Sequence, residues 1–279
     1  MTPHQVTAAR VVAAFAAVPL FTPGRTCLPI SRLFFSPSLQ SRSTGIWRAL
    51  EQPDRVLRAP LESSAAFFFF KELQGLVHAI VPGWFDRVLV AFDYGLVGVH
   101  PSLWLTRFAS PALNDSMQFA YMTHFLYLVI LPAILYVKRE RLAFWTVRVS
   151  TAIAHDSVYV IAVLVPVESP YYSLAALEPQ KLTGGYCTAL IEFIERFGRV
   201  HGAAFPSAHV AGSMVAILAS WRYRRWLFWL CLPFFVSRCV ATVYGRYHYV
   251  ADVLAGLAVG AVGFSVGTRL TRRTGTLPP

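Results

Sequence analysis

The chain has 279 residues, of which 56% are hydrophobic and only 14% are charged. A soluble domain carries about a quarter charged residues, so this composition excludes an ordinary soluble domain and indicates an integral membrane protein. The formal net charge of +11 suits anionic lipid headgroups or phosphorylated substrates. Nucleic acid is a poor alternative partner, because the basic residues gather at the ends of apolar stretches and form no single stripe.

The N-terminal part, residues 1–60, is predicted to be an extension outside the folded domain. Residues 1–50 contain no Asp or Glu, several arginines and an apolar stretch over 11–21. This pattern resembles a signal or transit segment. A disordered extension, or a start codon placed too early, explains the same composition equally well.

Residues 61–270 are predicted to form one all-α membrane domain, a bundle of about six transmembrane helices, and residues 271–279 a short cytoplasmic tail. Charges interrupt the apolar residues 61–100, so we expect one span there and an interfacial helix in the remainder. Residues 101–118 are expected to be a loop or surface segment. The clearer spans are predicted at 119–137, 143–166, 208–221, 226–244 and 249–267.

Three groups of basic residues predict the orientation of this bundle. They lie in two short connections and after the last span: Lys138, Arg139 and Arg141; Arg222, Arg224 and Arg225; Arg269, Arg272 and Arg273. Alternating the spans places all three groups on one side, which the positive-inside tendency makes cytoplasmic. The starts of the spans near residues 208 and 249 then face the non-cytoplasmic side together.

Two histidines lie at those span starts. His248 and Asp252 are four residues apart, so on a helix they share one face. A carboxylate there can accept the imidazole Nδ1 proton and leave Nε2 free to act as nucleophile or base. Ser207 is a good N-cap for the other helix, whose N–H groups attract phosphate. His209 would then lie beside the bound anion, placed to protonate a leaving oxygen.

Each pattern is weak alone. A His-x3-Asp pair is more often a pair on a helix surface, and Pro-Ser-x-His is an ordinary helix start. Together, at neighbouring helix starts on one face, the two patterns favour a functional site. The membrane also penalises ionisable groups that have no role, which weighs against the purely structural interpretation.

The sequence here resembles the type 2 phosphatidic acid phosphatase family, over roughly residues 84–268. The resemblance rests on Gly-Ala-Ala-Phe-Pro-Ser-Ala-His-Val-Ala at 202–211 and Tyr-Gly-Arg-Tyr-His-Tyr-Val-Ala-Asp-Val-Leu-Ala-Gly at 244–256. Val-Pro-Val-Glu-Ser-Pro-Tyr-Tyr at 165–172 resembles a proline-rich segment of the family's inositol phosphorylceramide synthase branch.

This resemblance implies a role for each residue of the two motifs. His248 would form a phosphohistidine, with Asp252 as its orienting partner. His209 would be the general acid towards the leaving alcohol, and Ser207 would bind phosphate. Neither metal nor cofactor is implied, because cationic side chains and N–H groups stabilise phosphate in this family. The four cysteines also show no CxxC pair and no metal-ligand spacing.

The chain departs from the family pattern at several positions. Ala208 stands where glycine is common, and Ala241 and Thr242 stand where the family has Ser-Arg. The family's first motif, a lysine followed by Arg-Pro, is not recognisable. Because a phosphoryl site needs compensating positive charge, other cations are expected to supply it. The candidates, in order of preference, are Arg246, Arg238 and Lys181.

Other ionisable residues in the apolar stretches are expected to be structural. Asp156 lies near the middle of its predicted span, and we expect it to pair with Arg238 from a later span. His100, His124 and His201 are expected to be structural or solvated. Glu168 lies in the segment that resembles the synthase branch, and the sequence gives it no physical role.

The sequence therefore predicts a multi-pass membrane enzyme that transfers a phosphoryl group from a lipid phosphoester through a phosphohistidine. Hydrolysis, a lipid phosphatase activity, is the simplest outcome, since water needs no dedicated acceptor site. A phosphotransferase of the inositol phosphorylceramide synthase type is the first alternative, and a non-catalytic permease or scaffold is the second. The lipid, the acceptor and the oligomeric state are left open.

Overall fold

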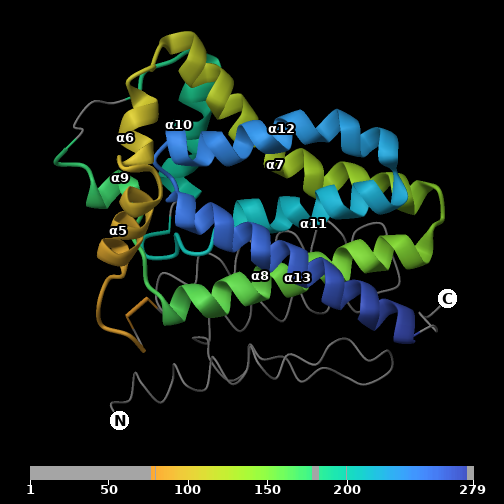
Figure 1. Ribbon diagram of the computed structural model, residues 1–279. Helices are drawn as coiled ribbons and strands as arrows, with labels where there is room; N and C mark the ends of the chain where they lie inside the picture. Colours follow the sequence, from red (N-terminus) through yellow and green to blue (C-terminus); the bar gives the residue numbers. More distant parts are fainter. Residues whose placement is uncertain (1–76, 79, 178–181, 199, 275–279) are drawn as a thin grey trace.

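The computed structural model describes residues 77–274 except 79, 178–181 and 199 (Figure 1). These described residues form helices, and their strand-like pairing is limited to an isolated parallel bridge between Val167 and Ala203. The predicted all-α class is confirmed for this part of the chain. The predicted N-terminal extension and the first part of the 61–100 region lie outside the described residues.

Four helices are long and apolar enough to cross a membrane. They are α7 (Pro111–Val137), α8 (Arg141–Leu164), α12 (Arg225–Tyr244) and α13 (Val250–Thr274). They contain the spans predicted at 119–137 and 226–244 and nearly all of those predicted at 143–166 and 249–267. The helix predicted near 208 is α11 (Ala208–Tyr223), whose 16 residues are fewer than the ~20 that a bilayer core requires.

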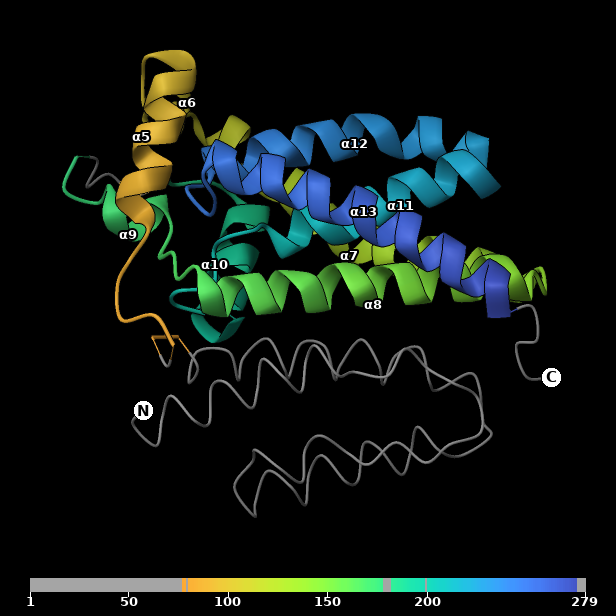
Figure 2. The same ribbon diagram turned by 60° about the horizontal axis from the view of Figure 1, so that its bottom comes forward.

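The remaining helices are short: α5 (Asp86–Val97), α6 (Pro101–Thr106), α9 (Pro170–Ser173) and α10 (Tyr186–Gly198). Helices α5, α6 and α9 gather at one end of the bundle, and α5 runs across the direction of the long helices (Figure 2). With 12 residues, α5 is too short to span a bilayer.

Residues 101–118 were expected to be a loop or surface segment, and the loop is wrong for all of them except 107–110. The others form α6 and the first turns of α7. Both helices begin with proline at the first helical position, where its missing N–H costs no hydrogen bond. Ser110 caps α7, because its side chain accepts a hydrogen bond from the N–H of Leu113 at 3.3 Å.

Helix α11 occupies the centre of the bundle and packs against α13, α8, α12 and α7. Small residues let α13 approach α11 closely. A Cβ atom on Gly256 would lie only 2.7 Å from the carbonyl oxygen of Ser207, so glycine is required at this contact. The starts of α11 and α13, which carry the two sequence motifs, are therefore held against each other.

The three basic groups lie at the opposite end of the bundle from α5, α6 and α9. The α7–α8 turn, the α11–α12 turn and the end of α13 all point towards that end (Figure 1). An ion pair between Arg224 in the α11–α12 turn and Glu140 in the α7–α8 turn joins these two turns. The expected separation of the basic groups from the histidine motifs is thus present in the fold.

Asp115 at the start of α7 fixes the start of α10. Its carboxylate accepts hydrogen bonds from the Thr188 N–H and hydroxyl, both at 2.9 Å, and from the Cys187 N–H at 3.3 Å. Replacing Asp115 with alanine removes the acceptor of these hydrogen bonds and is expected to loosen the start of α10. Amide hydrogen exchange should then accelerate in α10. Exposed Ser116 provides the control substitution, and equal protection in both variants would contradict the prediction.

Candidate active site

His248 lies just before α13, and Asp252 lies in the first turn of that helix. The imidazole Nδ1 is 3.3 Å from Asp252 Oδ2. The same oxygen accepts the Tyr249 N–H at 2.9 Å, so the carboxylate folds back over the helix start as in a capping box. His248 is not itself helical, contrary to the assumption behind the spacing argument, yet the expected contact forms. Both side chains are buried.

His209 in the first turn of α11 faces this pair, and its ring centroid lies 6.1 Å from that of His248. The backbone joins the two helix starts, because the Ser207 N–H donates to the Asp252 carbonyl at 3.1 Å. Ser207 is the N-cap of α11, as the sequence predicted, and its Oγ accepts the Val210 N–H at 3.4 Å. The structure therefore brings His248, Asp252, His209 and Ser207 together.

The end of α12 shapes the chain that leads to His248. We call residues 245–249 the His248 turn. The carbonyl of Thr242 accepts the N–H groups of Tyr247 at 3.0 Å and of His248 at 3.1 Å. Thr242 is fully buried in the position where the resembling family has arginine, so here that position secures the turn through its backbone.

Arg238 lies one helical turn before Thr242 and is 0% exposed. None of its three guanidinium nitrogens has a hydrogen-bond partner among the described residues. The guanidinium carbon lies 5.1 Å from the ring centroid of Tyr127, a cation–π contact. Its charge also acts on the imidazoles of His124 and His209. A buried cation without polar partners, close to both histidines, is suited to receive an anion.

The expected pairing of Asp156 with Arg238 is wrong. Every Arg238 nitrogen lacks a hydrogen-bond partner, which excludes an ion pair between the two side chains. The physical reason is the packing of their helices: α8 packs against α13, α11 and α7, whereas α12 packs against α7 and α11. Arg238 is therefore free of the structural role that the sequence suggested for it.

The other two candidate cations differ in position. Arg246 is buried in the His248 turn, with a positive φ of 60° that is unusual for a side chain larger than glycine. Its carbonyl accepts the Tyr171 N–H at 3.0 Å. This hydrogen bond ties the backbone of Arg246 to the segment that contains Tyr171. Lys181 lies outside the described residues.

The proline-rich segment at 165–172 also packs around the His248 turn. Asp86 in α5 accepts the Glu168 N–H at 2.9 Å and the Tyr249 hydroxyl at 2.7 Å. The Glu168 carboxylate, which had no assigned role, lies 2.8 Å from the His201 imidazole. Sequence segments far apart in the chain are thus tied to the turn that carries His248.

Two residues at the site were missed by the sequence reasoning. The Tyr121 hydroxyl lies 3.2 Å from His209 Nε2, and the Tyr121 ring stacks on Tyr247 with centroids 4.6 Å apart. The ring centroid of His124, which was expected to be structural or solvated, lies 4.9 Å from that of His209. Both come from α7, whose inward face could not be identified because the helix is apolar on most sides.

Tyr121→Phe is expected to lower kcat about tenfold, the effect of losing one hydrogen bond that orients His209. KM should change little, since the Tyr121 hydroxyl bonds the His209 imidazole and is not proposed to bind substrate. Turnover of the purified variant in detergent measures both constants. Tyr136→Phe, at the far end of α7 and exposed, is the matched control. An unchanged kcat for Tyr121→Phe would contradict the orienting role.

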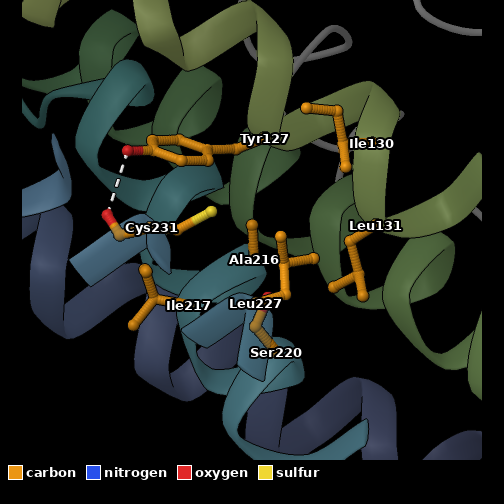
Figure 3. Close-up of a pocket in the computed structure, with 8 residues that line it drawn as sticks. All are labelled: Tyr127, Ile130, Leu131, Ala216, Ile217, Ser220, Leu227 and Cys231. Atoms are coloured by element: carbon orange, nitrogen blue, oxygen red, sulfur yellow. Dashed lines mark hydrogen bonds between the residues drawn. The ribbon is translucent and has the colours of Figure 1, made fainter. Parts of the chain in front are cut away.

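A separate apolar hollow lies between α7, α11 and α12 (Figure 3). Tyr127 lines it and points across it, with its hydroxyl donating to the Cys231 carbonyl at 3.2 Å. None of the predicted site residues lines this hollow.

Within the described residues there is also no group of His, Cys, Asp and Glu side chains that could hold a metal ion.

Comparison with known proteins gives one finding. Residues 88–266, more than half of the chain, match the PAP2 superfamily. Neither the curated proteins nor the solved structures contain a match to the chain. The matched region begins in α5 and ends in α13, so it includes both histidine motifs, three of the four candidate spans and most of the fourth. The chain belongs to the PAP2 superfamily.

Proposed function

We propose that this protein is an integral membrane enzyme that transfers a phosphoryl group from a lipid phosphoester through a phosphohistidine. Membership of the PAP2 superfamily supports phosphatase or phosphotransferase chemistry, and the four apolar helices support a membrane location. One observation carries the mechanistic part. His248, paired with Asp252, faces His209 with ring centroids 6.1 Å apart, so both imidazoles could act on one phosphoryl group.

The proposed reaction has two steps. The Nδ1–H of His248 donates a hydrogen bond to Asp252, so the Nε2 lone pair is free to attack phosphorus. A P–N bond forms while the P–O bond to the lipid alcohol breaks, and His209 gives its proton to the leaving oxygen. His209 then accepts a proton from an incoming water or alcohol. The incoming oxygen displaces His248 from phosphorus and restores the free imidazole.

Arg238 is the cation that the structure favours for balancing the phosphate charge. Its unpaired guanidinium is buried near His209 and His124, where a low dielectric strengthens its attraction to an anion. Arg246 in the His248 turn, Ser207 at the start of α11 and Lys181 are the further proposed phosphate ligands. The interaction of these groups with phosphate would grow as charge develops on the equatorial oxygens.

Hydrolysis is the proposed outcome, giving a lipid phosphatase. A phosphotransferase of the inositol phosphorylceramide synthase type is the second candidate, favoured by the packing of the proline-rich segment on the His248 turn. We further propose about six spans and a site on the non-cytoplasmic side. The orientation is supported by the basic groups at the opposite end of the bundle.

A labelled lipid phosphate tests the function directly. Purified protein in mixed micelles is incubated with ³²P-labelled phosphatidic acid and other lipid phosphates, with and without an added alcohol. Phosphate release identifies hydrolysis, and label in the added alcohol identifies transfer. Rapid quenching at alkaline pH should trap label on His248, which peptide mapping locates. Label on another residue would reassign the nucleophile, and absence of both turnover and label across the panel would favour a permease or scaffold.

A further inference from the structure

Helix α5 has two faces of opposite character. Its inward residues Asp86, Leu89 and Asp93 are buried, although two of them are acidic. Its outward residues are apolar: Val88 is 62% exposed, Phe92 50% and Leu96 54%. The outward residues are four apart and therefore form one stripe along the helix. A protein surface facing water would place the aspartates outside and these apolar side chains inside.

The position of α5 indicates what covers this apolar stripe. The helix lies across the end of the bundle, at the level where the long helices end (Figures 1 and 2). Exposed aromatic residues lie on it or in the segments before and after it: Tyr94 on the helix, and Trp84, Trp104 and Phe108 outside it. A second exposed aromatic group occupies the far end of the bundle, around the α11–α12 turn: Trp221, Trp226 and Trp229. Aromatic side chains at both ends of a set of spans mark the two membrane–water interfaces.

The inward face of α5 holds the start of α13. Asp93 accepts the Val250 N–H at 2.8 Å and the Ala251 N–H at 3.0 Å, and so caps the helix that carries Asp252. Burial raises the pKa of Asp93, although these two hydrogen bonds act in the opposite direction. Asp86, about two turns earlier on the same face, binds the Tyr249 hydroxyl at 2.7 Å. The two carboxylates thus hold the three residues that follow His248.

We propose that α5 is a membrane-interface helix. Its outward stripe of Val88, Phe92 and Leu96 lies among the lipids of the leaflet on the site side. From that position, Asp93 on the inward face holds the first turn of α13 and so positions the preceding His248 for reaction. The lipid contact does not depend on the proposed function, whereas the positioning role of Asp93 rests on it.

A lipid partner explains the observations better than a protein partner. The apolar side chains of α5 adjoin the lipid-facing sides of the spans, where exposed residues such as Phe234 and Val240 of α12 require acyl chains around them. An in-plane helix with an apolar stripe and flanking aromatic residues is the arrangement that buries such a stripe at the headgroup boundary. Arg87, exposed on the same helix, can then reach lipid phosphates.

Photocrosslinking tests the lipid contact without requiring turnover. The full chain, carrying p-benzoylphenylalanine in place of Phe92, is reconstituted into vesicles of phosphatidylcholine and phosphatidylglycerol and irradiated. The same photoreactive residue in place of Phe234 is the positive control for lipid contact. Phospholipid adducts at both positions are expected. Adducts only to protein at position 92, either within the chain or to a second copy, would overturn the interface assignment, as would no adduct there while position 234 reacts.

Asp93→Asn tests the positioning role, with Asp115→Asn as the matched control. Both aspartates accept two backbone N–H groups at a helix start, but Asp115 serves α10 and Asp93 serves α13. Both variants should lose thermal stability, and Asp93→Asn should lose more, because Asp93 is buried and Asp115 is only partly buried. Asp93→Asn should lower kcat about tenfold with KM within about twofold, whereas Asp115→Asn should leave kcat within about twofold. Equal kcat values for Asp93→Asn and Asp115→Asn would overturn the positioning role of Asp93. An inactive wild type would instead remove the proposed function, and the crosslinking result would still decide the lipid contact.

Discussion

His248→Ala is expected to lower phosphate release by a factor on the order of 10⁴ or more and to abolish the labelled intermediate. The loss is large because the proposed mechanism routes every turnover through a bond from His248 Nε2 to phosphorus. In that mechanism Asp252, 3.3 Å from the His248 imidazole, orients the nucleophile, and the facing His209 ring protonates the leaving oxygen. Turnover of a lipid phosphate and ³²P incorporation, measured side by side, check both parts of the prediction.

His201→Ala is the control for this substitution. His201 lies near the site but its side chain is 42% exposed, and its imidazole pairs with Glu168 instead of facing His209. That variant should retain turnover and label. If His248→Ala kept wild-type turnover, the phosphohistidine mechanism would be excluded. If it lost turnover but still accumulated label, the nucleophile would be another residue.

Arg238→Met is expected to move activity and stability in opposite directions. Activity should fall by about 10²–10³-fold, the effect of removing one preorganised group that stabilises charge in the transition state. Stability should rise by about 1–4 kcal/mol, because methionine removes a buried charge that has no polar partner among the described residues and keeps much of the volume. Thermal unfolding in detergent and turnover at saturating substrate provide the two measurements.

The opposite signs distinguish a binding role from a structural one. A guanidinium that mainly supports the fold through Tyr127 and Phe235 would lose stability and activity together when replaced. Arg238→Lys should restore part of the activity, since it keeps the charge but not the planar guanidinium. Arg272→Met, exposed at the far end of α13, should change neither quantity. A less stable Arg238→Met variant would count against an unpaired charge awaiting phosphate.

The positions of Thr242 and Arg238 explain how this chain can lack the arginine that the resembling family has at position 242. In this chain Thr242 uses its carbonyl to hold the His248 turn, while Arg238 stands one turn deeper on the same side of α12. A long side chain one turn away can serve the same anion. The sequence made Arg238 a candidate cation but also offered Asp156 as a competing partner. The helix packing removed that competitor.

Local features of the sequence determined the class of the fold and the core of the candidate site. Long apolar stretches predicted the four helices that can cross a membrane, because hydropathy depends on the residues of each segment alone. The spacing of His248 and Asp252, and the N-cap Ser207, specified contacts within one helix start each. Such contacts span a few residues, so the chain's own geometry is enough to predict them.

Only the tertiary structure decided which groups from different helices meet. Tyr121 and His124 contact His209, and Asp93 caps α13, although the partners are far apart in the chain. The packing of distant helices also leaves Arg238 without a hydrogen-bond partner among the described residues. In an apolar helix most faces look alike, so its composition does not show which side packs inward. That choice follows from the close approach of α11 and α13 at Gly256 and from the way the other helices fill the space around them.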